Sequence, residues 1–434
     1  MNVPDLTILV EPAEASAVVY GPLAGKTMNH LPEGQLSLVL TITNNEPDPV
    51  HLNNVTISFV GPPNVGPSAI AADLTIDPTQ TKKWYFPTAS NIILPEPAPG
   101  AVIVSLSCDT FSDPAQVSAT LGKYSSPAAG GGYLFPAKAA DLTKGEYWTG
   151  RSAKHGGAGG GTQMFAYDLL VRGYNESSQQ WQTPLPGAAG TKNEDFRSWG
   201  KPIYAMADGT VVQFKNDMPD NTKIGKQDPV PDPVEGNHFY IQHGPDLALY
   251  AHFQKGTLNP AFLSIGAAVQ EGDLLGICGN SGNSTEPHLH IQVNRTTVPW
   301  GGPPRPLQFR NMRVLDMAVA KPEPWPPTSA APWNPVAGQA LPSAMAVIWP
   351  EKLRFVIKPV WLEPLAWAWI IVIGGLMFTP GGIDCINCGP ALTDLMGIFS
   401  IVLGGAGLAR WVNGRLAAGK MIAPQIDQIG DRHG

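Results

Sequence analysis

This chain of 434 residues has few charged residues, no excess of positive charge and few cysteines. Only 15% of the residues are charged, against about 25% in ordinary soluble domains, so part of the chain is unusually apolar. The net charge is −7, which argues against a protein that binds nucleic acid through a basic surface. Four cysteines are too few for a disulfide framework. The first residues, MNVPDL, lack a basic start and a long apolar run, so we expect no signal peptide.

Glycine (47 residues) and proline (44 residues) are abundant, which favours β structure and loops over helix bundles. Gln35–Thr43 alternates apolar and polar residues, which predicts one strand whose buried face carries Leu36, Leu38, Leu40 and Ile42. Similar short runs occur at Leu6–Val10, Ala17–Tyr20, Val55–Val60, Ile70–Ile76, Lys83–Phe86, Ala101–Leu106 and Gln116–Leu121. Together they predict a mainly β chain that begins with an immunoglobulin-like β-sandwich over residues 1–125, a spacer or adhesion module.

The C-terminal part of the chain is apolar and rich in proline. Residues 317–350 are rich in Pro, Ala and Trp, which predicts a semi-rigid linker. Within residues 351–434, the apolar runs Leu365–Thr379 and Ala391–Ala409 each follow a proline and predict a transmembrane helical hairpin; a buried hairpin in a soluble core is the alternative. Basic residues flank the outer ends of the hairpin, which favours a cytoplasmic position for both ends.

Two cysteines, Cys385 and Cys388, lie between the two apolar runs. Their spacing is compatible with a redox pair, with half of a metal site, or with a local disulfide or two unpaired thiols. Cys108 and Cys278 sit in apolar surroundings and are interpreted as small core residues.

Histidines are concentrated in one stretch of the chain: His238, His243, His252, His288 and His290. His288 and His290 are separated by one residue, so on a strand both imidazoles point to the same face. One of them can then bind a metal while the other reaches the reacting centre. Asp168 lies in the hydrophobic run FAYDLL, where a carboxylate is costly unless it is paired or coordinated.

Five segments follow one another in a characteristic order between residues 200 and 293: GKPIYAMADGTVVQF, GNHFYIQHG, LYAHF, GAAVQEGDLLG and GNSGNSTEPHLHIQV. Over about residues 160–295 the chain resembles the lysostaphin/LytM-type zinc endopeptidases. The resemblance implies an antiparallel β peptidase domain, placed at residues 126–316, with one Zn²⁺ in a groove. Members of this family cut peptide cross-links or stems of bacterial peptidoglycan.

The resemblance also implies roles for individual residues. Asp168 and His290 match metal ligands, and His252 and His288 match two catalytic histidines that do not bind the metal. A catalytic zinc takes three protein ligands and activates a water in the open position. One free histidine can accept the proton of that water and pass it to the leaving amine, and the other can stabilise the oxyanion.

The chain departs from the family at the third ligand. The family places a histidine four residues before the aspartate, where this chain has Met164, a poor zinc ligand. His155 is the nearest upstream histidine, and the flexible GGAGGG that follows it would let it fold back, so we predict His155 as the third ligand. His238 or His243 could substitute, or His155 could be a solvent-exposed loop residue beside a weakened site. Asn193–Trp199 and Asp217–Glu235 are predicted to be loops around the groove.

The sequence therefore predicts a zinc-dependent endopeptidase of the bacterial cell envelope that is membrane-anchored or delivered as part of a larger apparatus. The alternative is a catalytically inactive peptidase-fold module with a binding or structural role in a phage-like or injection assembly. The charge bias of the hairpin would put the peptidase domain in the cytoplasm, so the route to the cell wall is open. The family includes enzymes for glycine bridges and for cross-links of D-amino acids, and the motifs favour neither.

Overall fold

The computed structural model describes residues 2–25, 32–87, 92–151, 155, 161–175, 177–178, 180–226, 232–316, 333–342, 345–350, 356–357 and 426–427. The chain divides into two compact units, Met1–Glu351 with His433–Gly434, and Lys352–Arg432. In the second unit, the described residues form two short antiparallel strands, β26 (Val356–Ile357) and β27 (Ile426–Asp427). The described residues contain strands and short 3₁₀ helices but no α-helix, which confirms the prediction of a mainly β chain.

No helix in the described part of the chain is long and apolar enough to cross a bilayer. The predicted hairpin, Leu365–Thr379 and Ala391–Ala409, lies outside the described residues, and so do Cys385 and Cys388. Cys108 and Cys278 are described, and both are buried free thiols, as predicted.

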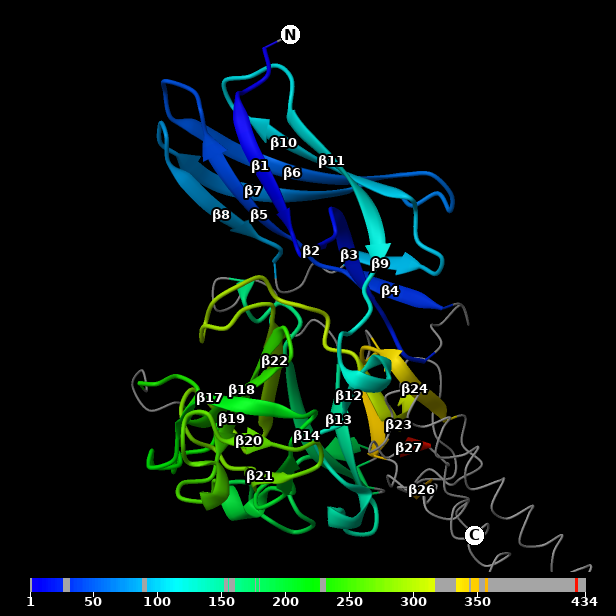
Figure 1. Ribbon diagram of the computed structural model, residues 1–434, viewed down its shortest axis with the longest axis vertical. Helices are drawn as coiled ribbons and strands as arrows, with labels where there is room; N and C mark the ends of the chain where they lie inside the picture. The colour runs from blue at the N-terminus through cyan, green and yellow to red at the C-terminus, as the bar shows by residue number, and fades with distance from the viewer. Residues whose placement is uncertain are drawn as a thin grey trace, which may run out of the picture. The chain divides into compact units, whose positions relative to one another are not determined.

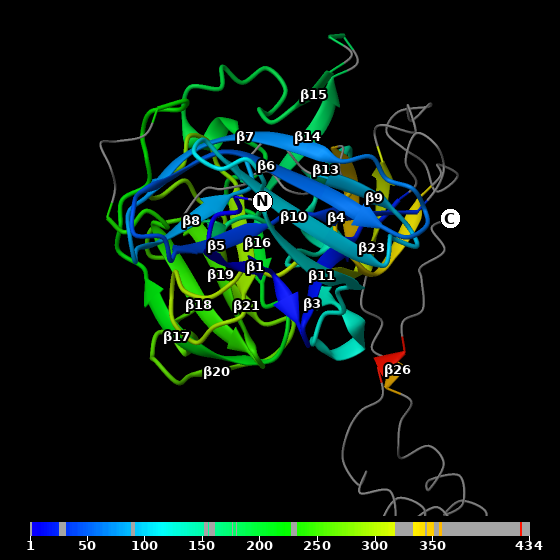
Figure 2. The ribbon, with the colours of Figure 1, turned by 90° about the horizontal axis from the view of Figure 1, so that it is seen from above.

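The first eleven strands form two sheets, which we call the N-terminal sheets (Figure 1). The smaller has the order β1-β5-β8, and the larger the order β7-β6-β10-β11-β3-β4-β9 with β2 on β3. Seen from above, β7, β6 and β10 of the larger sheet run side by side (Figure 2). The strands are β1 (Leu6–Glu11), β2 (Ala13–Glu14), β3 (Ala17–Pro22), β4 (Glu33–Leu36), β5 (Val39–Asn44), β6 (Val50–Val60), β7 (Ser68–Ile76), β8 (Thr81–Tyr85), β9 (Ile92–Pro95), β10 (Ala101–Cys108) and β11 (Ala115–Lys123). Apolar residues of both sheets share one buried cluster. The immunoglobulin-like topology stays a prediction.

Gln35–Thr43, predicted as one strand, is two strands. β4 ends at Leu36 and pairs within the larger sheet, whereas β5 begins at Val39 and pairs within the smaller one. The four apolar residues of the alternation are nevertheless fully buried: Leu36, Leu38, Leu40 and Ile42. The chain crosses between the sheets around a shared core, so the apolar alternation continues where the hydrogen-bond ladder breaks.

Strands β12 to β25 form a second large sheet and one separate strand pair. The main path of the sheet is β12-β23-β25-β13-β14-β22-β19-β18-β17-β20, with β15 on β14, β24 on β23, and β16 paired separately with β21. The strands are β12 (Tyr133–Leu134), β13 (Glu146–Gly150), β14 (Tyr167–Asn175), β15 (Gln180–Gln182), β16 (Pro202–Tyr204), β17 (Gly209–Lys215), β18 (Asn237–His243), β19 (Asp246–Phe253), β20 (Ala268–Val269), β21 (Leu274–Ile277), β22 (Leu289–Asn294), β23 (Phe309–Asp316), β24 (Asn334–Gln339) and β25 (Ala346–Pro350). Short 3₁₀ helices occur at Ala129–Gly131 (η1), Ala139–Asp141 (η2), Asn193–Asp195 (η4) and Pro260–Phe262 (η5).

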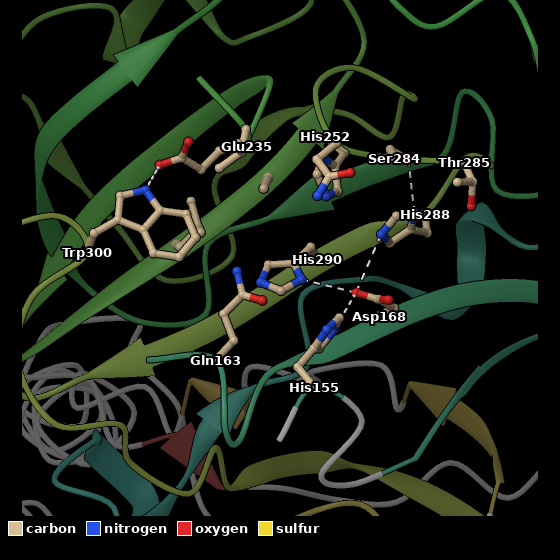
Figure 3. A pocket seen from close by; sticks show the side chains of 14 residues that line it. His155, Gln163, Asp168, Glu235, His252, Ser284, Thr285, His288, His290 and Trp300 are labelled. Carbon is tan, nitrogen blue, oxygen red and sulfur yellow. Dashed lines mark hydrogen bonds and ion pairs between the residues drawn. The ribbon is translucent and has the colours of Figure 1, made fainter. Parts of the chain in front are cut away.

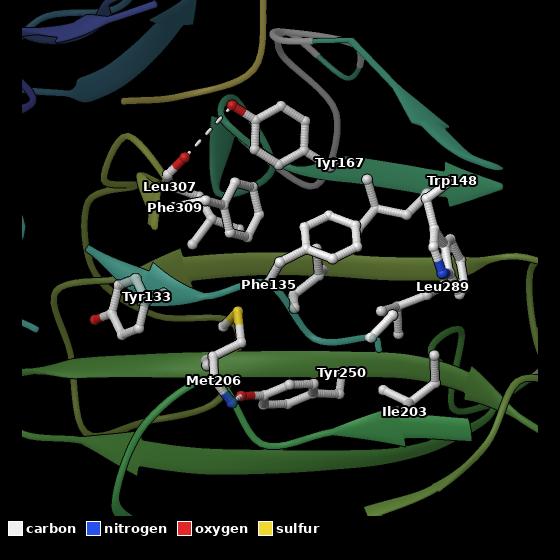
Figure 4. Close-up of a cluster of buried hydrophobic side chains, with 14 of the residues drawn as sticks. Tyr133, Phe135, Trp148, Tyr167, Ile203, Met206, Tyr250, Leu289, Leu307 and Phe309 are labelled. Carbon is white, nitrogen blue, oxygen red and sulfur yellow. Dashed lines mark hydrogen bonds between the residues drawn. The ribbon is translucent and has the colours of Figure 1, made fainter. Parts of the chain in front are cut away.

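One face of this sheet carries an aromatic and aliphatic core (Figure 4). The ring centroid of Phe309 lies 5.5 Å from that of Phe135 and 5.7 Å from that of Tyr167. Leu289 and Ile291 of β22 belong to the same core. Because side chains alternate along a strand, the residues between these apolar ones face the other side of the sheet.

Two strands, β24 and β25, lie within the stretch 317–350 that was predicted as a linker. β24 pairs with β23, and β25 lies between β13 and β23. Pro335 is tolerated because β24 pairs on one side only among the described strands, and proline is compatible with an edge position. Val347 and Ile348 of β25 are fully buried, so burial in the core stabilises this strand. The proline-rich composition of the segment does not reveal that burial.

Candidate metal centre

Two neighbouring strands carry the acidic and imidazole groups of the candidate site. In the antiparallel ladder of β14 and β22, Asp168 lies directly opposite His290. Tyr167 and Leu169 on either side of Asp168 face the apolar core, so the carboxylate faces away from it. The same alternation on β22 turns His290 away from the core. The two side chains are therefore brought together by strand register.

Three histidines surround one carboxylate oxygen (Figure 3). Oδ1 of Asp168 lies 3.0 Å from Nε2 of His155, 3.0 Å from Nδ1 of His290 and 3.4 Å from Nε2 of His288. Burial alone would raise the pKa of Asp168, but hydrogen bonds and charge from these histidines hold it well below its usual range. The carboxylate is therefore ionised at neutral pH.

Hydrogen bonds fix which nitrogen of His288 and of His290 faces Asp168. His288 Nδ1–H donates to the carbonyl of Glu286 (2.8 Å), so its Nε2 faces Asp168. Nε2–H of His290 donates to Oε1 of Gln292 (3.1 Å), so its Nδ1 faces Asp168. The Gln292 amide cannot be reversed, because its NH₂ donates to Thr162 O and to Asn294 Oδ1.

This arrangement suits a cation. Imidazole nitrogens and a carboxylate oxygen converge on one point, and their lone pairs would repel one another unless protons or a metal ion lay between them. The ligand atoms of His155, Asp168 and His290 lie within 4.8 Å of one another. Two nitrogen donors and one carboxylate oxygen form a ligand set that catalytic zinc uses, with a further position left for water. The residues present therefore fit a zinc ion.

His252 lies beside His288, and their ring centroids are 4.7 Å apart. Its Nδ1–H donates to the carbonyl of Ser281 (2.8 Å), which leaves Nε2 as its free atom. Burial, together with the neighbouring His288 and His290, holds the pKa of His252 well below its usual range. The backbone of His252 has a φ of 68°, a left-handed conformation that is rare for residues other than glycine and that clusters at functional sites.

The predicted site residues share one cavity of about 290 Å³, which His155, Asp168, His252, His288 and His290 all line. The structure therefore brings together the predicted ligands and the two predicted catalytic histidines; their individual roles stay predictions.

The cavity also has walls that the sequence motifs did not single out. Trp300 Nε1–H donates to Oε1 of Glu235 (Figure 3). The same oxygen accepts a hydrogen bond from Tyr240 Oη (2.9 Å). Val234 and Glu235 are the last two residues of Asp217–Glu235, which the sequence predicted as a loop around the groove, and both line the cavity. The sequence therefore indicated this wall in part. Gln163 and Trp300 lie outside the recognisable motifs.

Two further histidines lie away from the cavity. His243 Nδ1–H donates to the carbonyl of Asp208, and its Nε2 accepts from Tyr250 Oη, both at 2.9 Å. His238 contacts the carbonyl of Gly236 (2.9 Å), and burial lowers its pKa. Neither lies among the described cavity-lining residues, so substitution of the third ligand by either is not supported.

Comparisons with known proteins cover part of the chain. The peptidoglycan DD-endopeptidase ShyA of Vibrio cholerae is 32% identical over 95 residues, which are 22% of this chain and 17% of ShyA. An uncharacterized metalloprotease of Buchnera aphidicola is 33% identical over 95 residues, 22% of this chain and 20% of that protein. The chain thus spans no more than a fifth of the length of these relatives.

Solved structures show similar partial matches. The lysostaphin catalytic domain from Staphylococcus simulans has 21% identity and a TM-score of 0.19, and covers 28% of this chain and 81% of that one. The catalytic domain of EnpA, a prophage-encoded M23 protein from Enterococcus faecalis, has 24% identity and a TM-score of 0.18, with 28% and 80% covered. The sequence model of Peptidase family M23 matches residues 191–300. Residues 191–300 of this chain are therefore a Peptidase family M23 domain of the lysostaphin/LytM type.

Proposed function

We propose that the chain is a zinc-dependent endopeptidase that cleaves peptide cross-links or stems of bacterial peptidoglycan. The observation that carries the proposal is the convergence of His155, Asp168 and His290 in a cavity that also holds His252 and His288. Membership of residues 191–300 in family M23 supports the reaction class, and the peptidoglycan DD-endopeptidase ShyA supports the substrate class.

In this proposal, His155, Asp168 and His290 hold the zinc ion. When bound, zinc supplies a Lewis acid and lowers the pKa of a coordinated water to about 7. His252 and His288 lie side by side, and each has its Nδ1–H tied to a backbone carbonyl. Nε2 is therefore the atom of each that acts on the substrate, and Nε2 of His288 also lies 3.4 Å from Oδ1 of Asp168. One accepts a proton from the attacking water and returns it to the leaving amine, and the other stabilises the oxyanion.

The test is zinc content and hydrolysis of purified peptidoglycan by the full chain, with wild type beside His155→Ala. His51→Ala is the control, because His51 lies on β6 and its side chain is 36% exposed, away from the cavity. We expect one zinc per wild-type and His51→Ala chain with release of soluble fragments, and loss of both in His155→Ala. A folded wild-type chain without zinc and without products would instead indicate a binding or structural module built on a peptidase fold.

For the location, we propose anchoring in the bacterial envelope through Leu365–Thr379 and Ala391–Ala409, or delivery to the wall by a larger apparatus. This rests on the apolar composition of these runs. Ala391–Ala409 has about the length that spans a bilayer, and Leu365–Thr379 reaches that length only if its helix begins near Val360. Expression of the full chain followed by alkaline extraction of membranes tests the anchor. Retention in the membrane pellet supports it, and full release into the supernatant rejects it.

A further inference from the structure

A short segment separates the loop of His155 from the strand of Asp168. This brace segment, Gly161–Ala166, is folded by two backbone hydrogen bonds, Met164 N to Gly161 O (3.3 Å) and Ala166 N to Gln163 O (3.0 Å). β14 begins directly after it, at Tyr167. Its position therefore bears on Asp168, the second residue of that strand.

One side of the brace segment is seated on the N-terminal sheets. Met164 is 0% exposed and Phe165 is 5% exposed, and both belong to the buried cluster of those sheets rather than to the core of the second sheet. Gly161 has a φ of +83°, and a Cβ there would lie 2.5 Å from Cδ1 of Tyr85 and 2.9 Å from Cγ2 of Val39. Strands β5 and β8 therefore contact the backbone of Gly161 with no room for a side chain.

The other side of the brace segment is tied to β22. The carbonyl of Thr162 accepts hydrogen bonds from Nδ2 of Asn294 (2.9 Å) and from Nε2 of Gln292 (3.3 Å). Nε2 of Gln292 also donates to Oδ1 of Asn294 (2.8 Å), and both amides are buried. Oε1 of Gln292 in turn accepts from Nε2–H of His290 (3.1 Å). A continuous set of contacts thus runs from the N-terminal sheets to a candidate zinc ligand.

We propose that the N-terminal sheets are part of the metal centre: they hold the brace segment, which leads directly into the strand of Asp168 and positions His290 through Gln292. Gln292, Asn294, Val39 and Tyr85 are positioning residues that do not contact the metal. This inference rests on the proposed zinc site. It also accounts for Met164, which stands where the family has a histidine and here anchors the segment in the core of the N-terminal sheets.

The hydrogen bonding between the brace segment and β22 is tested by zinc affinity, measured by chelator competition on the full chain. Gln292→Leu removes both the acceptor for His290 and the donor to Thr162, and we expect zinc affinity to fall about 10- to 100-fold. Gln292→Glu keeps the acceptor and should lose less. Gln213→Leu is the matched control, because Gln213 contacts the buried non-ligand His238 at 3.3 Å. It should leave zinc affinity unchanged.

The contact between the brace segment and the N-terminal sheets is tested by Gly161→Ala, because the new methyl group clashes with the Tyr85 ring. We expect about tenfold weaker zinc binding and a changed absorption spectrum of the cobalt-substituted protein, and partial recovery of both when Tyr85→Ala is added. Gly61→Ala is the control for backbone strain, because Gly61 has a φ of +94° and its nearest neighbouring atom would be 3.5 Å from the new Cβ.

Thermal unfolding on the same samples separates positioning from loss of fold. A wild-type chain that binds zinc, with unchanged affinity and cobalt spectrum in folded Gln292→Leu and Gly161→Ala, would overturn the inference and leave the proposed function standing. A folded wild-type chain that binds no zinc would overturn both. If Gly161→Ala fails to fold, the test falls to Tyr85→Ala alone, where an unchanged cobalt spectrum overturns the role of the N-terminal sheets.

Discussion

At the scale of single residues, the imidazoles of the cavity differ from His243 in what their second nitrogen contacts. His252 and His288 each donate Nδ1–H to a backbone carbonyl, and Nε2 of His288 faces Asp168. His290 donates Nε2–H to Gln292, and its Nδ1 faces Asp168. His243 has neither nitrogen available, since both are bonded to groups of the fold. The His-x-His motif predicts that two imidazoles share a face, but only the hydrogen-bond partners decide which atom each presents.

His243 makes stability depend on pH. Burial lowers its pKa to about 4, from about 6.5 in the unfolded chain. Because the folded-state pKa is depressed, the contribution is fully present above about pH 6.5 and is lost as the pH falls toward 4. Between pH 7 and pH 4.5 we expect His243 to account for a loss of about 2 kcal/mol in the free energy of unfolding.

Urea unfolding of wild type and His243→Gln at both pH values measures this loss. The glutamine cannot take up a proton in this range, so the variant should lose about 2 kcal/mol less than wild type on acidification. Equal losses in the two proteins would show that His243 does not titrate between these pH values.

At the scale of elements, one face of β22 packs into the apolar core, and the other face carries polar residues of the candidate site. Leu289 and Ile291 enter the apolar core, whereas His288, His290, Gln292 and Asn294 lie between the core-facing positions and form the polar contacts of the candidate site. Strand alternation makes this division visible in the sequence PHLHIQVN. The sequence does not reveal that Gln292 and Asn294 hold a segment from another part of the chain.

Leu289→Ala should separate the two faces. Leu289 is 1% exposed, and truncation of a buried leucine costs about 2–5 kcal/mol in the free energy of unfolding. We expect a lower melting temperature with one zinc still bound per chain, because the ligands lie on the other face.

Leu185→Ala is the control for Leu289→Ala, since Leu185 is 40% exposed and its loss should change stability by no more than about 0.5 kcal/mol. Loss of zinc from Leu289→Ala at unchanged stability would contradict the division of β22 into two faces.

At the scale of the molecule, ion pairs join the N-terminal sheets to the second sheet. The Arg305 side chain is only 4% exposed; its Nε donates to Oε1 of Glu14 at 2.7 Å, and its Nη2 donates to the carbonyl of Ala13 at 3.0 Å. Arg295 contacts the same carboxylate at 3.0 Å and Asp246 at 2.6 Å. These contacts make the N-terminal sheets a fixed neighbour of the candidate site.

Glu14→Ala should weaken this connection. It leaves the buried guanidinium of Arg305 without its main carboxylate partner, and loss of a hydrogen bond to a charged group costs about 1–3 kcal/mol. We expect a melting temperature several degrees lower by calorimetry.

The matched variant is Asp73→Ala, whose carboxylate is 97% exposed and should contribute little to stability. If Glu14→Ala and Asp73→Ala melt at the same temperature as wild type, the Arg305–Glu14 pair does not hold the two parts together.

The sequence by itself determined the strand-rich character of the chain, the peptidase segment and the candidate site residues. Local alternation is enough for a strand, and His288 and His290 share a face whatever surrounds them. The sequence also predicted His155 as a site residue, because a glycine-rich segment permits the chain to fold back.

Only the tertiary structure decided which contacts form between residues that are far apart in the chain. The break between β4 and β5 leaves the apolar alternation intact, so it could not be seen before the two sheets were in place. Strands β24 and β25 form in a proline-rich stretch because they are buried against β23 and β13. The seat of Met164 and Phe165 in the N-terminal sheets depends on contacts between residues far apart in the chain, and such contacts leave no periodic mark in the sequence.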